Sequence, residues 1–183
     1  MKAGILASAL TVLCATPLRA QSEPPIPLHR PPEWGLNAGY GIPVRLNSST
    51  SNDKLVLFEP GVAFRVSGRC EYLVEGHFAR YLGPGGSMVG ALPLSGRLYL
   101  GNGRVLPYVS LGAGVGWTDL TALDEIDRRF NFLLQGSVGV RGATSDRRAW
   151  TLEARLSHVS NAGTVKPNYG LNMLVVLGGW RFR

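Results

Sequence analysis

Charged residues, cysteines and long apolar runs are all scarce in this 183-residue chain. Asp, Glu, Lys and Arg make up 17% of it, against about 25% in ordinary soluble domains. A helical membrane protein needs apolar runs of about 20 residues, and none occurs after the first residues. Disorder is excluded because apolar and aromatic residues are spread along the whole chain. What remains is a chain with 24 Gly and 45% hydrophobic residues. Its apolar residues are spread out rather than clustered, as in strands that alternate apolar and polar residues.

The N-terminus predicts a secretory signal peptide over residues 1–20. Lys2 gives the positive start, an apolar segment follows, and Leu18-Arg19-Ala20 is an acceptable cleavage site. Residues 21–32 hold five prolines, which predicts a Pro-rich periplasmic lead-in before a barrel domain over 33–183. Cleavage after Ala20 would remove Cys14 and leave Cys70 as the one thiol, buried and inert, without an internal disulfide.

Beyond residue 33 the chain alternates with period 2, apolar residues on one face and polar residues or glycine on the other. In the first such segment Trp34, Leu36, Ala38 and Tyr40 share the apolar face. The pattern predicts eight strands of roughly ten residues, the length of a tilted membrane-spanning strand. They cover residues 34–44, 55–67, 71–82, 92–100, 107–117, 130–141, 149–158 and 171–182.

The expected fold class is therefore all-β: an eight-stranded antiparallel transmembrane β-barrel of the outer-membrane type. The small and isolated charged residues of the polar face suit a narrow barrel interior, and the strand-end aromatics suit interfacial girdles. A secreted lipocalin-like barrel is the alternative. With both termini periplasmic, the segments facing outside would be 46–54, 83–90, 118–129 and 159–170.

The basic residues give little support to nucleic-acid binding. The formal net charge is +7, but only Arg128-Arg129 and Arg147-Arg148 are adjacent, so no basic patch forms. An anionic membrane surface is the better match for an exported basic chain. The expected location is the outer membrane, crossed several times, and the sequence allows a monomer or a homodimer.

Three polar residues stand out on the apolar face near one rim. His158 and Ser160 lie two apart, so they share a face of the seventh strand with Leu156. Asn172 shares the lipid-facing parity of Leu174 in the eighth strand. Polar groups facing lipid are costly unless they serve a purpose. His158 can act as the base for a Ser160 nucleophile if Asn172 orients its ring.

The residues alone leave two interpretations open. In the first, Asn161 and the N–H groups around Ala162 and Gly163 stabilise an oxyanion. In the second, Ser-Asn-Ala-Gly and Pro-Asn-Tyr-Gly are ordinary turns, and His158 is an interfacial polar residue. His77, beside Glu75 on the polar face, is expected in a lumen network, and no second ligand at suitable spacing makes a metal site with His158.

The run His-x-Ser-Asn-Ala-Gly at 158–163, followed by Lys-Pro-Asn-x-Gly at 166–170, resembles the lipid A 3-O-deacylase family, also called PagL-type or acyloxyacyl hydrolase-like proteins. The resemblance implies His158 as base and Ser160 as nucleophile, with Asn161 and Asn168 linked to activity. The family's third triad member is a Glu where this chain has Asn172. Asn can orient an imidazole but carries no charge to stabilise an imidazolium.

The expected function is hydrolysis of the 3-O-linked acyl chain of lipid A by an outer-membrane Ser-His esterase that needs no cofactor and no metal. The partner is lipopolysaccharide in the outer leaflet, with Lys166 meeting a phosphate and Gly163 and Asn168 in the substrate-binding loop. The alternative is an inactive structural or lipopolysaccharide-binding barrel, because Asn172 replaces the Glu.

Overall fold

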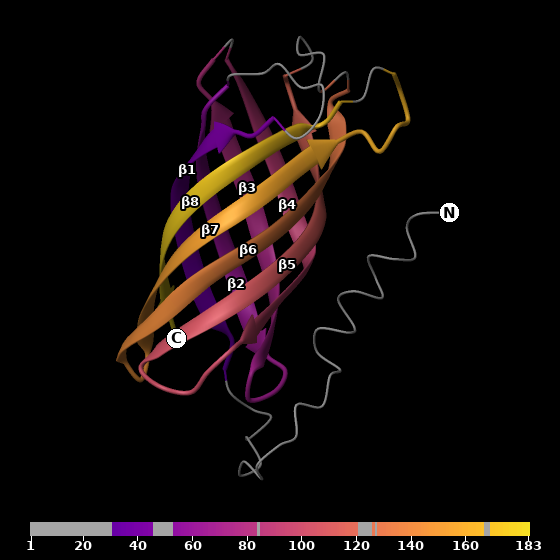
Figure 1. Ribbon diagram of the computed structural model, residues 1–183. Coiled ribbons are helices and arrows are strands. Elements are labelled where there is room, and N and C mark those ends of the chain that lie inside the picture. Colours follow the sequence, from indigo (N-terminus) through magenta and orange to yellow (C-terminus); the bar gives the residue numbers. More distant parts are fainter. Residues whose placement is uncertain (1–30, 46–52, 84, 121–125, 127, 167–168) are drawn as a thin grey trace.

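The computed structural model describes residues 31–45, 53–83, 85–120, 126, 128–166 and 169–183. Eight antiparallel strands, each paired with its neighbours in sequence, form a closed barrel because β1 also pairs with β8 (Figure 1). The predicted fold class is confirmed. The strands are β1 (Glu33–Pro43), β2 (Leu55–Arg65), β3 (Cys70–Tyr81), β4 (Gly86–Tyr99), β5 (Val105–Thr118), β6 (Phe130–Ser145), β7 (Arg148–Ser160) and β8 (Leu171–Phe182).

The two rims of the barrel differ in their connections. Short turns, such as Asp146-Arg147 between β6 and β7, join the strands at the rim near the C-terminus. At the opposite rim, where β7 ends at Ser160 and β8 begins at Leu171, three of the four connections are longer, and the one between β3 and β4 is short. This rim is called the upper rim, as it stands in Figure 1. The predicted signal peptide and most of the lead-in lie outside the described residues, as do parts of the predicted outer loops, residues 46–52, 84, 121–125, 127 and 167–168.

Apolar side chains cover the outside of the wall, as the alternation predicts. Trp34, Trp117 and Val138 are about three-fifths exposed although they are large and apolar, a surface suited to lipid rather than water. The opposite parity faces the interior and is buried. Among the described residues no helix is long and apolar enough to cross a membrane. Cys70 is buried and not in a disulfide, as expected.

The interior has two layers. The sequence predicts the lower, charged layer but not the upper, apolar one. Near the upper rim the barrel is filled with apolar side chains, which include Leu55, Leu57, Tyr81, Met88, Leu133, Val159, Leu171, Met173 and Val175. This layer explains why β8 is apolar on both faces. Leu120 and Ile126, from the segment between β5 and β6, join the same cluster, so the upper part of the lumen is packed with side chains rather than open.

The second layer, below the first, is a network of buried charges. Arg155 is paired with Glu59 and, at 2.7 Å, with Glu153. His77 Nδ1 lies 3.0 Å from Glu59 Oε1, so the predicted lumen position of His77 is confirmed, with Glu59 as its partner. Charges inside a barrel are tolerable only when they are paired in this way.

β4 departs from the prediction at both its start and its parity. The strand begins at Gly86, within a segment expected to be an outer loop, and its register with β5 shifts between Ala91 and Leu94. The shift inserts a residue next to Pro93, which has no N–H to donate. Parity therefore reverses, and Leu92, expected to face lipid with Leu94, is instead buried in the interior.

Candidate active site

Ser160 and His158 are the last two outward-facing residues of β7. The strand continues two residues past its predicted end, so that Ser160 keeps the parity of His158 and Leu156. Both polar side chains are half-buried at the upper rim. At about 3.3 Å per residue their Cα atoms stand about 7 Å apart along the strand, which places the hydroxyl and the imidazole on one face as predicted.

Asn172 faces His158 directly across the β7–β8 ladder. The two residues are register partners, and His158 Nδ1 lies 2.8 Å from Asn172 Oδ1. Because an amide oxygen only accepts, the His158 proton in this pair sits on Nδ1. In the neutral ring the other nitrogen, Nε2, is then an acceptor, which is the tautomer that a base for a serine hydroxyl requires.

The Asn172 side chain is 4% exposed although it has outward parity. Its Nδ2 is buried and has no hydrogen-bond partner among the described residues. An N–H without an acceptor in such a place costs about 1–3 kcal/mol. A carboxylate at this position would only accept hydrogen bonds and would leave no donor unsatisfied, whereas the amide of Asn172 leaves its Nδ2 donor without a partner among the described residues.

Gly170 forms the wall behind the His158 ring, and sequence reasoning missed it. Its φ is +68°, and a Cβ placed on it would lie 2.5 Å from His158 Cε1 and 3.2 Å from Nε2. Only glycine satisfies both the backbone conformation and the space. The signal was present in the sequence, since Gly170 ends the Pro-Asn-Tyr-Gly turn just before β8.

Asn161 organises the loop that follows Ser160. Its Oδ1 accepts a hydrogen bond from Gly163 N–H at 2.9 Å, and its Nδ2 donates to Val165 O at 3.2 Å. Its carbonyl oxygen also accepts a bond from Thr164 Oγ1. Ala162, with φ +54°, and Gly163, with φ +76°, are both left-handed, so the chain turns sharply just after the serine.

Among the described residues, the structure shows no contact between the remaining predicted site residues and the Ser160–His158–Asn172 group. Lys166 is exposed on the same loop, while Asn168 lies outside the described residues. Glu153, the one carboxylate on β6, β7 and β8, is buried on the lumen side and cannot replace Asn172. No group of three or more His, Cys, Asp or Glu that could hold a metal occurs in the described part of the chain.

A family model described as lipid A 3-O-deacylase (PagL) matches residues 61–181. The chain belongs to the PagL family. This stretch includes β7, the whole loop that follows it and all of β8 except its last residue. No curated protein sequence matches the chain significantly.

Solved structures with the same barrel include the outer membrane enzyme PagL, with 15% identity and a TM-score of 0.64 over 80% of this chain and 97% of that one. Neisserial surface protein A has 16% identity and a TM-score of 0.58, over 82% and 96%. OprG from Pseudomonas aeruginosa has 11% identity and a TM-score of 0.52, over 84% and 96%. At these identities the likeness concerns the fold.

PagL family membership makes this an outer-membrane barrel of the lipid A deacylase class. The exposed apolar surface is then its lipid-facing belt, and the lipocalin-like alternative no longer applies. The upper rim of this PagL-type barrel places Ser160, His158 and Asn172 at the edge of the belt, where a polar site meets the membrane surface.

Proposed function

We propose that this protein hydrolyses the 3-O-linked acyl ester of lipid A, with Ser160 as nucleophile and His158 as general base. The observation that carries the proposal is the His158 Nδ1–Asn172 Oδ1 hydrogen bond of 2.8 Å. It holds the imidazole in the tautomer that can accept the Ser160 proton, on the one face of the barrel that contacts lipid.

The reaction would follow the two steps of a serine esterase. Ser160 Oγ attacks the ester carbonyl carbon while His158 Nε2 takes the hydroxyl proton. The tetrahedral intermediate collapses as the bond to the sugar oxygen breaks, and the imidazolium returns its proton to that oxygen. Water, deprotonated by the same Nε2, then attacks the acylated serine, and the fatty acid leaves as Ser160 regains its proton.

Asn172 would act as a positioning residue for His158. A neutral amide fixes the tautomer but does not offset the charge of the imidazolium that forms in each step. We therefore expect a slower enzyme than a carboxylate at this position would give.

The turn after Ser160 would supply the oxyanion donors. Gly163 N–H donates to Asn161 Oδ1, whereas no hydrogen bond among the described residues uses the Ala162 N–H. We propose that Asn161 holds the turn in shape, so that Ala162 N–H is aimed at the developing charge. Lys166 and Asn168 would contact the polar part of lipid A, where a lysine attracts phosphate.

The location of the site suits a substrate that stays in the outer leaflet. A lipid A ester lies just below its headgroup, and His158 and Ser160 lie just above the apolar belt. The ester can therefore reach Ser160 without leaving the membrane, and no cofactor is required.

The test uses purified protein in vesicles that contain lipid A, with release of the 3-O fatty acid measured by chromatography. Ser160→Ala should abolish release. Ser157→Ala is the matched control, because Ser157 is on the same strand but buried in the lumen, and it should retain activity. Equal release by wild type and Ser160→Ala would refute the serine mechanism.

A second candidate is a barrel that binds lipopolysaccharide without turnover, and the neutral Asn172 favours it. On this account wild type releases no fatty acid but still retains lipid A. Asn172→Glu, which restores the residue implied by the family resemblance, would then create activity that wild type lacks.

A further inference from the structure

The rim of the barrel opposite the candidate active site, called the lower rim, is strongly basic. The C-terminus lies at this rim (Figure 1). Arg104, Arg147, Arg148 and Arg183 are all exposed there. Among the described residues of this rim, the one exposed acidic side chain is Asp146. The exposed charge of the lower rim is therefore mainly positive, at the membrane surface opposite the one that the candidate active site faces.

Three of these arginines meet where β7 begins and β8 ends. Arg147 and Arg148 are adjacent in sequence, and Arg183 N–H donates a hydrogen bond to Arg147 O at 3.1 Å. Arg148 is also the register partner of Phe182, the residue before Arg183. The backbone thus brings three arginines to one short stretch of the rim. Arg147, Arg148 and Arg183 are called the arginine cluster.

Little of the positive charge of the cluster is neutralised by the protein. Arg147 and Arg148 form no ion pair with any described residue. The Arg183 guanidinium lies 3.5 Å from Glu33 Oε2, but the same oxygen also lies 2.7 Å from the Arg141 guanidinium. Neighbouring like charges repel one another, so an anion placed among the three arginines would be stabilised by all of them.

The cluster stands at the edge of the lipid-facing belt rather than beneath the barrel. Arg148 has outward parity, two residues before Trp150 on the same face of β7. Trp180 is the register partner of Trp150, and Trp34 is the register partner of Phe182. All four aromatic side chains face outward. Trp marks the level of the lipid headgroups, so a guanidinium just below these rings lies at the depth of the lipid phosphates.

Trp150 is held at this level by its contact with β6. Gly142 is its register partner, and a Cβ on Gly142 would lie 2.2 Å from Trp150 Cε2. The indole therefore covers the glycine, in space that any larger residue would occupy. Packing fixes the girdle at this point of the wall, and the depth of Arg148 is fixed with it.

We propose that the arginine cluster binds the phosphate of an anionic glycerophospholipid at this membrane surface. A guanidinium is a planar fork that binds phosphate through two parallel hydrogen bonds, and the cluster offers three such forks. A soluble anion would approach the exposed turn from below, whereas the position of Arg148 beside the aromatic girdle fits a lipid headgroup. The inference is independent of the proposed esterase, whose site is at the other rim.

The test uses the quenching of tryptophan fluorescence by brominated lipids. Trp34, Trp150 and Trp180 lie near the lower rim, whereas Trp117 is at the upper end of β5. Trp117→Phe protein therefore reports on the lower rim alone. The purified protein is placed in phosphatidylcholine vesicles that contain a fixed fraction of phosphatidylglycerol, with the bromines on one lipid or on the other. The ratio of the two quenching efficiencies measures the preference for the anionic lipid.

Trp117→Phe protein should prefer phosphatidylglycerol. Arg148→Gln should lower that preference about fivefold, the contribution of one basic residue near an anionic membrane surface, and Arg147→Gln/Arg148→Gln should remove it. High salt should weaken the preference as well, because the arginines are exposed. No preference in the parent protein, or an unchanged preference in the double variant, would overturn the proposal.

Arg104→Gln is the matched control. Arg104 is exposed at the same rim, in the turn between β4 and β5, and like Arg148 it forms no ion pair with a described residue. The substitution removes the same charge outside the cluster and should leave the preference unchanged. An equal loss with Arg104→Gln and Arg148→Gln would mean that the total charge of the rim attracts the lipid, and the site would be refuted. Unfolding in urea shows that each variant is folded.

A soluble anionic polymer is the other occupant that the charge of the cluster would admit. Binding of fluorescent poly-glutamate to the protein in detergent micelles measures it. We expect no poly-glutamate binding that Arg148→Gln removes. Binding that Arg148→Gln does remove, together with equal quenching by the two brominated lipids, would assign the cluster to a soluble partner and refute the lipid site.

Discussion

Asn172→Asp is the substitution that examines the site most closely, because Asp has the shape of Asn. It keeps an acceptor 2.8 Å from His158 Nδ1 and replaces the Nδ2 that has no partner among the described residues. No hydrogen bond among those residues is lost, and a negative charge is gained beside the ring that becomes cationic during the reaction.

The gain can be estimated from hydrogen-bond energies. A bond to a charged group contributes about 1.5–3 kcal/mol, against about 1 kcal/mol for a neutral one. A difference of roughly 1–2 kcal/mol in the transition state corresponds to a rate increase of roughly 5- to 30-fold. Asn172→Leu removes the acceptor at similar volume, so it should lower the rate roughly tenfold.

The assay is kcat/KM for fatty acid release from lipid A in vesicles, with urea unfolding of each variant to show that the barrel is intact. The predicted order is Asp above Asn above Leu. If folded Asn172→Asp were no faster than wild type, the account of His158 orientation would be wrong. If Asn172→Leu were as fast as wild type, residue 172 would not act through His158 at all.

Three further substitutions test other parts of the structure. Gly170→Ala places a Cβ 2.5 Å from His158 Cε1, and a ring displaced by about 1 Å should lower kcat about 100-fold. In the control Gly163→Ala a Cβ would meet nothing within 4 Å, so the free energy of unfolding should fall only by the backbone strain of about 1–2 kcal/mol. Asn161→Asp keeps the acceptor for Gly163 N–H and loses the donor to Val165 O, so its kcat should lie between those of wild type and Asn161→Ala; equal losses would instead make the Asn161 amide itself an oxyanion donor. Arg155→Met leaves Glu59 and Glu153 without their shared cation and should lower the free energy of unfolding in urea by about 3–5 kcal/mol. The control Arg183→Met, whose ion pair with Glu33 is partly exposed, should lower it by less than about 1 kcal/mol. Similar values for both variants would mean that the lumen network adds no stability.

Alternation was enough to predict the strands because the outside of the wall is apolar almost throughout. The bounds predicted for β8 coincide with those observed, and Ser160 has the parity assigned to it. β4 was predicted wrongly, because Gly85, Gly86 and Gly90 resemble a loop and a bulge beside Pro93 reverses the parity of Leu92. A period of two cannot show an inserted residue.

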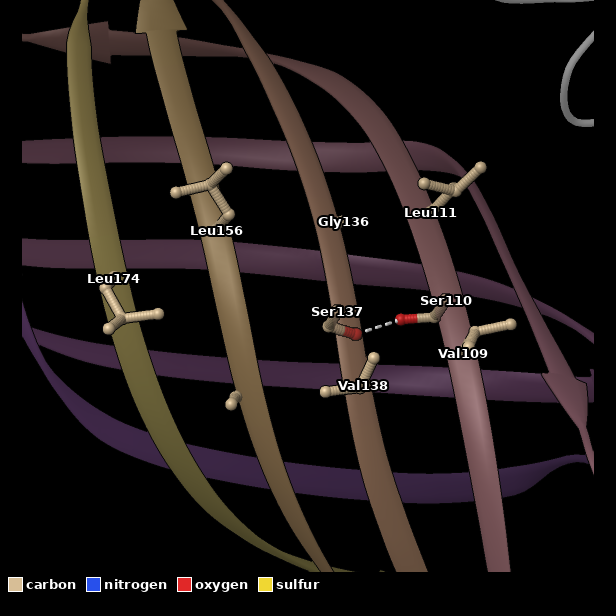
Figure 2. Close-up of a pocket in the computed structure, with 9 residues that line it drawn as sticks. Val109, Ser110, Leu111, Gly136, Ser137, Val138, Leu156 and Leu174 are labelled. Atoms are coloured by element: carbon tan, nitrogen blue, oxygen red, sulfur yellow. Dashed lines mark hydrogen bonds between the residues drawn. The ribbon is translucent and has the colours of Figure 1, made fainter. Parts of the chain in front are cut away.

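The site was only partly predictable for a related reason. Parity placed His158, Ser160 and Asn172 on one face, but it could not show that His158 and Asn172 are register partners, since register depends on loop geometry. The role of Gly170 depends on a contact across that register. Likewise, the small residues Gly136 and Ala154 line a hollow in the outer wall (Figure 2), and because they lie on adjacent strands, the pattern of a single strand does not reveal it.

The most direct test of the central claim is the mass of lipid A from outer membranes that contain wild type, Ser160→Ala or Ser157→Ala protein at equal folded amounts. We predict that wild type and Ser157→Ala yield lipid A lacking one 3-O acyl chain, and that Ser160→Ala leaves lipid A fully acylated. Fully acylated lipid A with well-folded wild type, or the same loss with Ser160→Ala, would contradict a Ser160–His158 esterase.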